Sequence, residues 1–212
     1  MTTSRDNLRR QGPARVVVLA SGTGSLLQSL LAAAESDYPA RIVGVVVDRD
    51  CTAADRAAAA GIDCTRVLLR DYDDRAAWDD ALTAVTASYD PDLVVTAGFM
   101  KILGPAFLAR FGGSVINSHP ALLPAFPGAH AVPDALAYGV KVTGCTVHLV
   151  DDGVDTGPIL AQEAVAVHAD DDEAALHERI KTVERRLLAD TVAAVATRGV
   201  LTDGRKAVIP SE

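Results

Sequence analysis

Short, continuous apolar runs recur along the first half of this 212-residue chain and constrain its fold more than any other feature. Such runs are typical of strands that are buried on both faces of a parallel sheet. Segments with helical character separate them, and the connections are only a few residues long. This alternation predicts an α/β fold with a mostly parallel, twisted, Rossmann-like sheet and helices on both faces.

The expected elements follow from where the apolar runs and the helix-capping and helix-breaking residues fall. The expected strands are 15–20, 42–47, 64–68, 93–96 and one that begins at Val115 and ends near Asn117. The helices expected between them are 26–35, 53–60, one from Asp73 or Asp74 to Tyr89, and a short one from Pro105. After an irregular Pro- and Gly-rich segment, the second half is expected to hold antiparallel strands at 142–150 and 159–167, a long helix at 170–197, and a final strand with a ragged tail within 199–212.

No internal repeat or low-complexity linker interrupts this order. We therefore predict one domain at 15–212, preceded by a flexible lead at 1–14. The domain has an N-terminal half of about 15–115 and a C-terminal half of about 116–200.

The composition argues against several classes of function. A formal net charge of −8 lacks the basic footprint of a nucleic-acid binder. Cys51, Cys64 and Cys145 form no CxxC pair and are expected to be reduced. The polar N-terminus does not resemble a signal peptide, and no apolar run reaches the roughly 20 residues of a spanning helix. We expect a cytoplasmic protein that acts on small molecules and has no nucleic-acid or membrane partner.

In doubly wound sheets, ligands bind outside the carboxyl ends of the strands. Four segments are expected to converge there, namely 21–25, Asp48, 98–103 and 117–119. The first, SGTGS, joins a strand to a helix, where inward-turned amides and the helix N-terminus favour an anion. Its spacing is not that of a P-loop, and Leu27 stands where a dinucleotide-binding loop has its third glycine. The loop predicts a monophosphate site, with a dinucleotide site or a ligand-free turn as alternatives.

Asn117 and His119 lie on the same side of an extended strand end. An amide donor beside an imidazole can stabilise a carbonyl oxygen that gains negative charge, and the imidazole can also move a proton near neutral pH. Asp155, in an acidic turn, can supply a carboxylate. Taken alone, an Asn-x-His pair often only caps loop backbone, and an acidic turn is usually solvated.

Other residue types predict no further chemistry. His130 and His148 have no metal-binding spacing with His119, so no metal site is expected. No G-x-S-x-G elbow is present, so a serine hydrolase has no nucleophile. Cys145 and Trp78 are expected to pack in the core.

Five sequence strings occur in one order along the chain: SGTGS, AGFMKILGPAF, INSHPALLPAFPG, TGCTVHLVDDGVDTGPIL and ERIKTVERR. Together, from about Arg15 to Arg198, they resemble the phosphoribosylglycinamide formyltransferase family, the folate-dependent enzymes of purine biosynthesis within the wider formyltransferase family. The resemblance implies direct transfer of the formyl group of 10-formyltetrahydrofolate, as co-substrate, to the amine of glycinamide ribonucleotide. It also implies that 15–115 is the phosphate-binding half and 116–200 the folate-binding and catalytic half.

The resemblance implies roles for individual residues as well. Asn117 and His119 hold the formyl oxygen, while Asp155 pairs with His119 and helps to accept the proton of the attacking amine. The residues implied to bind the ribonucleotide are Thr23, Gly24, Ser25, Leu26 and Glu184. Those implied to bind the folate are Arg75, Met100, Lys101, Ile102, Leu103 and Asn117.

Two positions depart from the pattern of the family. Leu26 replaces the usual Asn of the phosphate loop, so one side-chain contact to the phosphate is expected to be missing. Lys101 replaces the usual Arg of the folate loop, which keeps the charge and loses the fork geometry.

Alternatives remain for the partner and for the class. Methionyl-tRNA formyltransferase is expected to need a basic C-terminal domain, and formyltetrahydrofolate hydrolase an N-terminal regulatory domain, and this chain leaves little length for either. A nucleotide-binding oxidoreductase or a binding module built on 21–25 would leave the combination of Asn117, His119 and Asp155 unexplained. A monomer or a homodimer is expected.

Overall fold

The computed structural model describes residues 12–34 and 37–211. Most of the predicted lead at 1–14, and the predicted helix end at Glu35, lie outside these residues. The strands are β1 (Ala14–Ala20), β2 (Ala40–Val47), β3 (Cys64–Arg66), β4 (Leu93–Thr96), β5 (Val115–His119), β6 (Val142–Leu149), β7 (Ile159–Ala166), β8 (Leu201–Asp203) and β9 (Lys206–Val208). The helices are α1 (Ser25–Ala33), α2 (Thr52–Ala59), α3 (Arg75–Ser88), α4 (Pro105–Phe111), α5 (Ala131–Tyr138) and α6 (Glu173–Arg198), with a 3-10 turn at Leu69–Asp71.

Within the described residues the strands form one nine-stranded sheet in the order β3-β2-β1-β4-β5-β6-β7-β9-β8. β1 to β5 pair in parallel, β6 pairs antiparallel with both β5 and β7, and β9 pairs in parallel with β7 and antiparallel with β8. The chain moves outward from β1 to β3 and then returns to place β4 on the other side of β1. The expected mostly parallel sheet with helices on both faces is confirmed, and the reversal of strand order creates a crevice at the carboxyl ends of β1 and β4.

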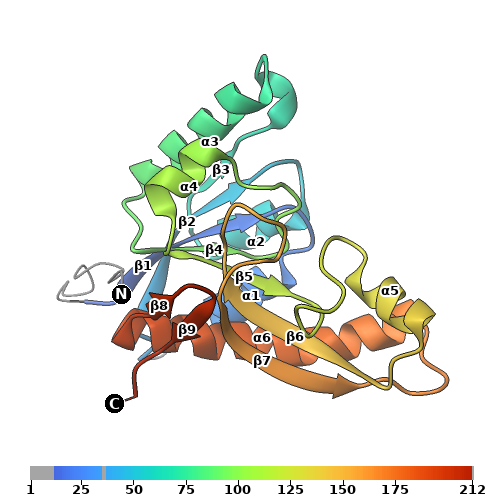
Figure 1. Cartoon of the computed structure of the whole chain (residues 1–212). Coiled ribbons are helices and arrows are strands. Elements are labelled where there is room, and N and C mark those ends of the chain that lie inside the picture. The colour runs from blue at the N-terminus through green and yellow to red at the C-terminus, as the bar shows by residue number, and fades with distance from the viewer. Residues whose placement is uncertain (1–11, 35–36, 212) are drawn as a thin grey trace.

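Side-chain alternation along β1 divides the packing into two cores on opposite faces of the sheet. Val16 and Val18 face a core covered by α1, α2 and α6, whereas Val17 and Leu19 face one covered by α3 and α4. Figure 1 shows α3 and α4 on one side of the sheet and α6 running along β6 and β7 on the other. Trp78 is fully buried in the second core, as expected.

Two expectations about the elements are wrong, and one helix was not predicted. β5 continues to His119, because its pairing with the antiparallel β6 extends two residues past the expected end. α5 lies in a stretch for which no element was predicted, and its Pro133 is tolerated because it falls in the first helical turn. The tail forms a hairpin of β8 and β9 instead of one strand, with Gly204 at φ 58° in a two-residue Gly-Arg turn.

The structure also bears on membrane association in one respect. Among the described residues, no helix combines the length and the apolar character that crossing a membrane requires.

A side chain from α3 holds the start of α4. Asp79 is only 2% exposed, and its carboxylate accepts hydrogen bonds from the amides of Gly104 at 3.0 Å and Ala106 at 2.8 Å. A Cβ at position 104 would overlap this carboxylate, so glycine is needed there. Because the first amides of a helix have no partner within the helix, Asp79 fixes both α4 and the end of the preceding loop, 97–104.

We predict that Asp79→Ala lowers the free energy of unfolding by about 2–3 kcal/mol, because it leaves buried amides without an acceptor. Urea denaturation followed by circular dichroism measures this change. The matched control is Asp80→Ala, which removes the exposed neighbouring carboxylate and is expected to change stability by less than about 0.5 kcal/mol. Equal losses in the two variants would contradict the role given to Asp79.

Candidate active site

A cleft of about 640 Å³ lies at the carboxyl ends of β1, β4 and β5. It is lined by residues 22–26, 96–103, 117–120, 128, 129, 148, 150, 151, 153–155, 177, 181 and 184. Three of the four segments expected at this rim therefore meet around one space. Asp48 does not line the cleft; it is buried, pairs with Arg49 at 3.0 Å and lies 4.0 Å from the Lys101 ammonium group.

The glycine-rich loop presents backbone to the cleft. Gly24 precedes α1 with φ 71°, and a Cβ there would lie 2.9 Å from the Cα of Ala53, so the position requires glycine. α1 has no side-chain N-cap and no acidic residue in its first turn. The Leu26 side chain is 7% exposed and packs in the core, so this residue offers the cleft mainly its backbone. The loop can hold an anion through helix amides and the helix dipole.

Hydrogen bonds tie the glycine-rich loop to its neighbours. The amide of Ser21 donates to the carbonyl of Gly98 at 3.2 Å, and the hydroxyl of Ser21 accepts from the amide of Met100 at 2.8 Å. Arg56 of α2 donates to the carbonyl of Thr23 at 2.8 Å. The loops after β1 and β4 are thus held as one wall of the cleft.

The segment 100–103, predicted to bind folate, lines this wall. Met100 and Ile102 are 58% and 62% exposed, which is unusual for large apolar side chains, whereas Leu103 is buried. Arg75 at the start of α3 donates to the carbonyl of Ile102 and lies 4.5 Å from the centroid of the Trp78 ring. Arg75 therefore lies beside this segment but does not line the cleft itself.

β5 presents different side chains to two sides, because successive side chains of a strand alternate. Asn117 and His119 both face Asp155, with Nδ2 of Asn117 3.5 Å and Nδ1 of His119 3.3 Å from its carboxylate oxygens. Ser118, between them, instead donates to Glu184 of α6 at 2.7 Å. The structure thus brings together the three predicted catalytic residues, and it places Glu184 on the same cleft.

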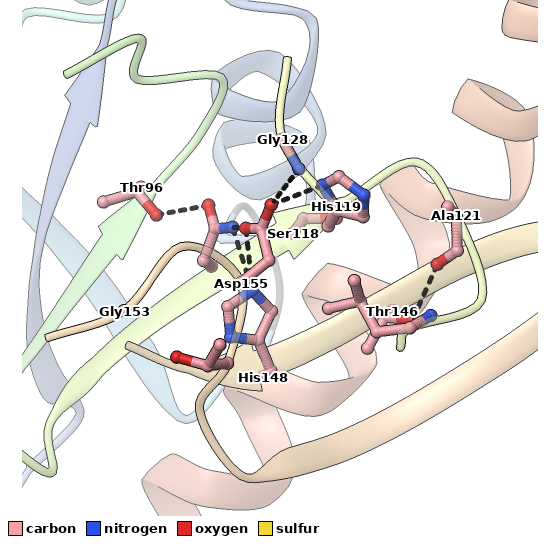
Figure 2. A network of polar contacts seen from close by, with 12 residues as sticks. Thr96, Ser118, His119, Ala121, Gly128, Thr146, His148, Gly153 and Asp155 are labelled. Atoms are coloured by element: carbon pink, nitrogen blue, oxygen red, sulfur yellow. Dashed lines mark hydrogen bonds and ion pairs between the residues drawn. The ribbon is translucent and has the colours of Figure 1, made fainter. Parts of the chain in front are cut away.

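The carboxylate of Asp155 is the centre of a polar network (Figure 2). Its Oδ2 accepts from the amide of Gly128 at 2.7 Å and lies 3.3 Å from Nδ1 of His119. Its Oδ1 lies 3.5 Å from Nδ2 of Asn117 and 3.6 Å from Nε2 of His148. Burial by itself would raise the pKa of Asp155, but hydrogen bonding from His148 and Gly128 and the nearby charge of His119 outweigh it, so this pKa is lowered.

The side-chain amide of Asn117 is fixed in one orientation. Its Oδ1 accepts from the hydroxyl of Thr96 at 2.6 Å, and its Nδ2 lies 3.0 Å from Nε2 of His148. The opposite orientation would place the amide oxygen against the carboxylate of Asp155. The donor end of Asn117 therefore faces His148 and Asp155, and the residue also lines the cleft.

The imidazole of His119 lies between two acceptors. Its Nε2 is 2.8 Å from the carbonyl oxygen of Phe126, and its Nδ1 faces Asp155. Because a carbonyl only accepts, Nε2 carries a hydrogen, and the contact with Asp155 is attractive when Nδ1 is also protonated. Burial lowers the pKa of His119, against the opposing influence of Asp155 and the Phe126 carbonyl. This arrangement can take up a proton at Nδ1 and pass it to the carboxylate.

The two residues that face the ring of His119 both have unusual backbone conformations. Phe126 and Asp155 each have φ 54°, a region that residues other than glycine seldom adopt. Gly157, two residues after Asp155, lies so close to the carbonyl of Leu149 that no side chain fits there. Such strained positions concentrate at functional sites, where the surrounding structure holds them.

His148 is a member of the network that the sequence did not identify. It was expected only to lie within an apolar strand, and it is indeed 2% exposed on β6. The antiparallel register pairs it with Asn117, which brings its ring to the amide and to Asp155. Its Nδ1 donates to the Leu149 carbonyl at 2.8 Å, which fixes the ring with Nε2 facing Nδ2 of Asn117 and Oδ1 of Asp155. In the sequence, a histidine between Val147 and Leu149 was visible, but nothing there indicated its partners.

Metal ligation has no support among the residues that the structure describes. They contain no group of three or more His, Cys, Asp or Glu side chains arranged to hold a metal ion. Cys145 is fully buried, and burial raises the pKa of its thiol to about 12, so it stays protonated.

Comparison with known proteins shows which family the chain belongs to. Residues 14–192 match the formyl transferase family, a stretch that includes every residue lining the cleft. Phosphoribosylglycinamide formyltransferase of Mycobacterium tuberculosis is 66% identical over 197 residues, which are 93% of this chain and 92% of that protein.

Solved structures share the fold. Glycinamide ribonucleotide transformylase 1 from Symbiobacterium toebii matches with a TM-score of 0.91 and 39% identity, covering 97% of this chain and 98% of that one. A formyltetrahydrofolate deformylase from Pseudomonas syringae matches with a TM-score of 0.87 and 29% identity, covering 93% of this chain and 66% of that one. The fold alone therefore does not distinguish transfer from hydrolysis.

The electrostatic account of His119 can be tested by an NMR titration of its ring. We predict that the pKa of His119 lies below the ordinary value, since burial is the largest influence on it. Asp155→Asn should lower this pKa further, because it removes the carboxylate that favours the protonated ring. Asp152→Asn, which changes an exposed carboxylate in the same turn, is the matched control. A rise in the His119 pKa in Asp155→Asn would contradict the account.

Proposed function

We propose that this chain, which belongs to the formyl transferase family, transfers the formyl group of 10-formyltetrahydrofolate to the amine of glycinamide ribonucleotide in purine biosynthesis. The observation that carries the proposal is the 66% identity, across almost the whole of both proteins, to phosphoribosylglycinamide formyltransferase of Mycobacterium tuberculosis. The cleft supports it, because an anion-binding loop and an amide, imidazole and carboxylate network line the same space.

The ribonucleotide occupies the end of the cleft formed by the glycine-rich loop and α6. Amides of the segment 23–26 hold its phosphate, which suits a loop whose following helix has no side-chain cap. The carboxylate of Glu184 accepts hydrogen bonds from the ribose hydroxyls. Lys181, one turn earlier on α6, also lines the cleft and adds positive charge. The backbone offered by Leu26 compensates in part for the missing side-chain contact at that position.

The folate occupies the part of the cleft beside the loop after β4. The exposed side chains of Met100 and Ile102, together with the backbone of 100–103, form an apolar wall for its ring system. Arg75, next to that wall, meets the carboxylates of the folate tail. Lys101 contributes a positive charge near the same loop, although Asp48 lies 4.0 Å from its ammonium group.

The reaction is a direct transfer. The unprotonated amine of the ribonucleotide attacks the formyl carbon, and the formyl oxygen gains negative charge. Asn117 donates to this oxygen through Nδ2, and His119 stabilises the same charge once its Nδ1, which faces Asp155, has taken up a proton from the attacking amine. The proton lost by the amine then passes from His119 to Asp155, whose lowered pKa keeps it ionised before the attack. The bond from the formyl carbon to the folate nitrogen then breaks as the carbonyl re-forms, and that nitrogen takes up the proton that Asp155 had received, which returns the network to its starting state.

Hydrolysis is the second candidate, favoured by the structural match to a formyltetrahydrofolate deformylase. Water would then replace the amine as the attacking group in the same network. We expect instead that the absorbance signal of 10-formyltetrahydrofolate turnover depends on added glycinamide ribonucleotide. Formation of the formylated ribonucleotide, followed by mass spectrometry, identifies the acceptor. Equal rates of deformylation with and without the ribonucleotide would replace the proposal with the hydrolase.

The three central residues are predicted to be needed for turnover. Asn117→Ala, His119→Ala and Asp155→Ala should each lose at least about a hundredfold in kcat, as is typical when one oxyanion donor is removed. Steady-state kinetics at saturating folate and ribonucleotide measures this loss. His168→Ala and Asp152→Ala change exposed residues of the same types and should keep wild-type rates. Near-normal turnover in folded His119→Ala and Asp155→Ala would rule out the mechanism.

A further inference from the structure

Ser118 lies between the two predicted catalytic residues of β5 but has a different partner. Its hydroxyl donates to Oε1 of Glu184 at 2.7 Å. The two residues are 8% and 5% exposed, so this contact is shielded from bulk water, and both also line the cleft. A hydrogen bond to a buried charged group contributes more than one at the surface, because the carboxylate has lost its hydration.

Glu184 needs such a partner. Burial raises its pKa, while the Ser118 hydroxyl and the charges of Lys181 and Arg185 lower it, and burial prevails. Removing the hydroxyl would therefore raise the pKa of Glu184 further and favour the neutral acid. A neutral carboxyl would accept hydrogen bonds from a ligand more weakly than a carboxylate does.

The Ser118 hydroxyl also fixes the orientation of the Glu184 carboxylate. With Oε1 occupied by Ser118, the second carboxylate oxygen of Glu184 remains for a ligand in the cleft. Since β5 also carries Asn117 and His119, the contact fixes Glu184 relative to the catalytic groups. Neighbouring residues of the same strand thus serve the two ends of the cleft.

We propose that Ser118 is a positioning residue for the acceptor substrate: it holds the Glu184 carboxylate in place to receive the vicinal hydroxyls of the ribose. This inference rests on the proposed function for the identity of that substrate. It assigns Ser118 no contact with the reacting atoms. Its effect is expected in the affinity for the ribonucleotide rather than in the chemical step.

Several other titratable groups lie near Glu184, and their effects on the pH dependence of binding have to be distinguished from that of Glu184. Lys181 and Arg185 lie on α6, and Cys145 on β6 is close enough for Glu184 to raise the pKa of its thiol, which stays neutral. His177 of α6 lines the same cleft, and burial and Lys181 lower its pKa. A pH effect assigned to Glu184 must therefore disappear when Glu184 itself no longer titrates.

The test compares wild type with Ser118→Ala. KM for glycinamide ribonucleotide should rise roughly tenfold, in line with loss of a hydrogen bond to a charged group, while kcat and the KM for the folate change much less. Because the Glu184 pKa is higher in the variant, the rise of KM with falling pH should begin at a higher pH than in wild type. Ser118→Thr, which keeps the hydroxyl, should restore the wild-type profile.

In a Glu184→Gln background, Ser118→Ala should no longer shift the pH profile. If Ser118→Ala does not fold, Ser118→Cys fills the same space with a weaker donor and should shift KM in the same direction. Calorimetric titration with glycinamide ribonucleotide measures the affinity without turnover, so the inference is tested separately from formyl transfer. Unchanged affinity and an unshifted pH profile in folded Ser118→Ala and Ser118→Cys would overturn it, as would a shift that persists with Glu184→Gln.

Discussion

The arrangement of the cleft depends on one carboxylate, that of Asp155, which joins segments far apart in the sequence. It accepts from the amide of Gly128 at 2.7 Å and lies within 3.6 Å of the side chains of Asn117, His119 and His148. Burying a carboxylate costs free energy unless the group is paired. Asp155 therefore needs these partners for its own stability, and at the same time it holds them in place. The hydrogen bonds and charges of these partners outweigh burial and lower the pKa of Asp155, so the group favours its ionised form.

Successive side chains of β5 point to opposite sides of the strand. The Asp155 network therefore lies on one side of β5, and Glu184 lies on the other. Asn117 and His119 face Asp155, and Ser118 faces Glu184 of α6. Rigid sheet positions hold polar groups more precisely than loops do, because their neighbours fix the backbone. In the proposed function, binding of the acceptor and the chemistry on it therefore depend on adjacent residues that do not share a side-chain partner.

The sequence predicted the sheet well because its strands are continuous apolar runs, and it placed Asn117, His119 and Asp155 at the site through their resemblance to a family. It did not identify His148, because a histidine within an apolar strand indicates nothing until the register of β5 and β6 is known. The link from Ser118 to Glu184 was missed for the same reason, since helix α6 crosses β5 only in the folded chain. Local patterns predict elements, whereas long-range pairings decide which polar side chains meet.

The central claim is that His119 and Asp155 act as one unit during formyl transfer. A double-mutant cycle on turnover tests it directly, with His119→Ala, Asp155→Ala and the double variant measured under the same conditions. If one proton-handling unit has been removed, the double variant should lose about as much kcat as the more damaged single variant. Losses that multiply would show that the two residues contribute independently and would contradict the account.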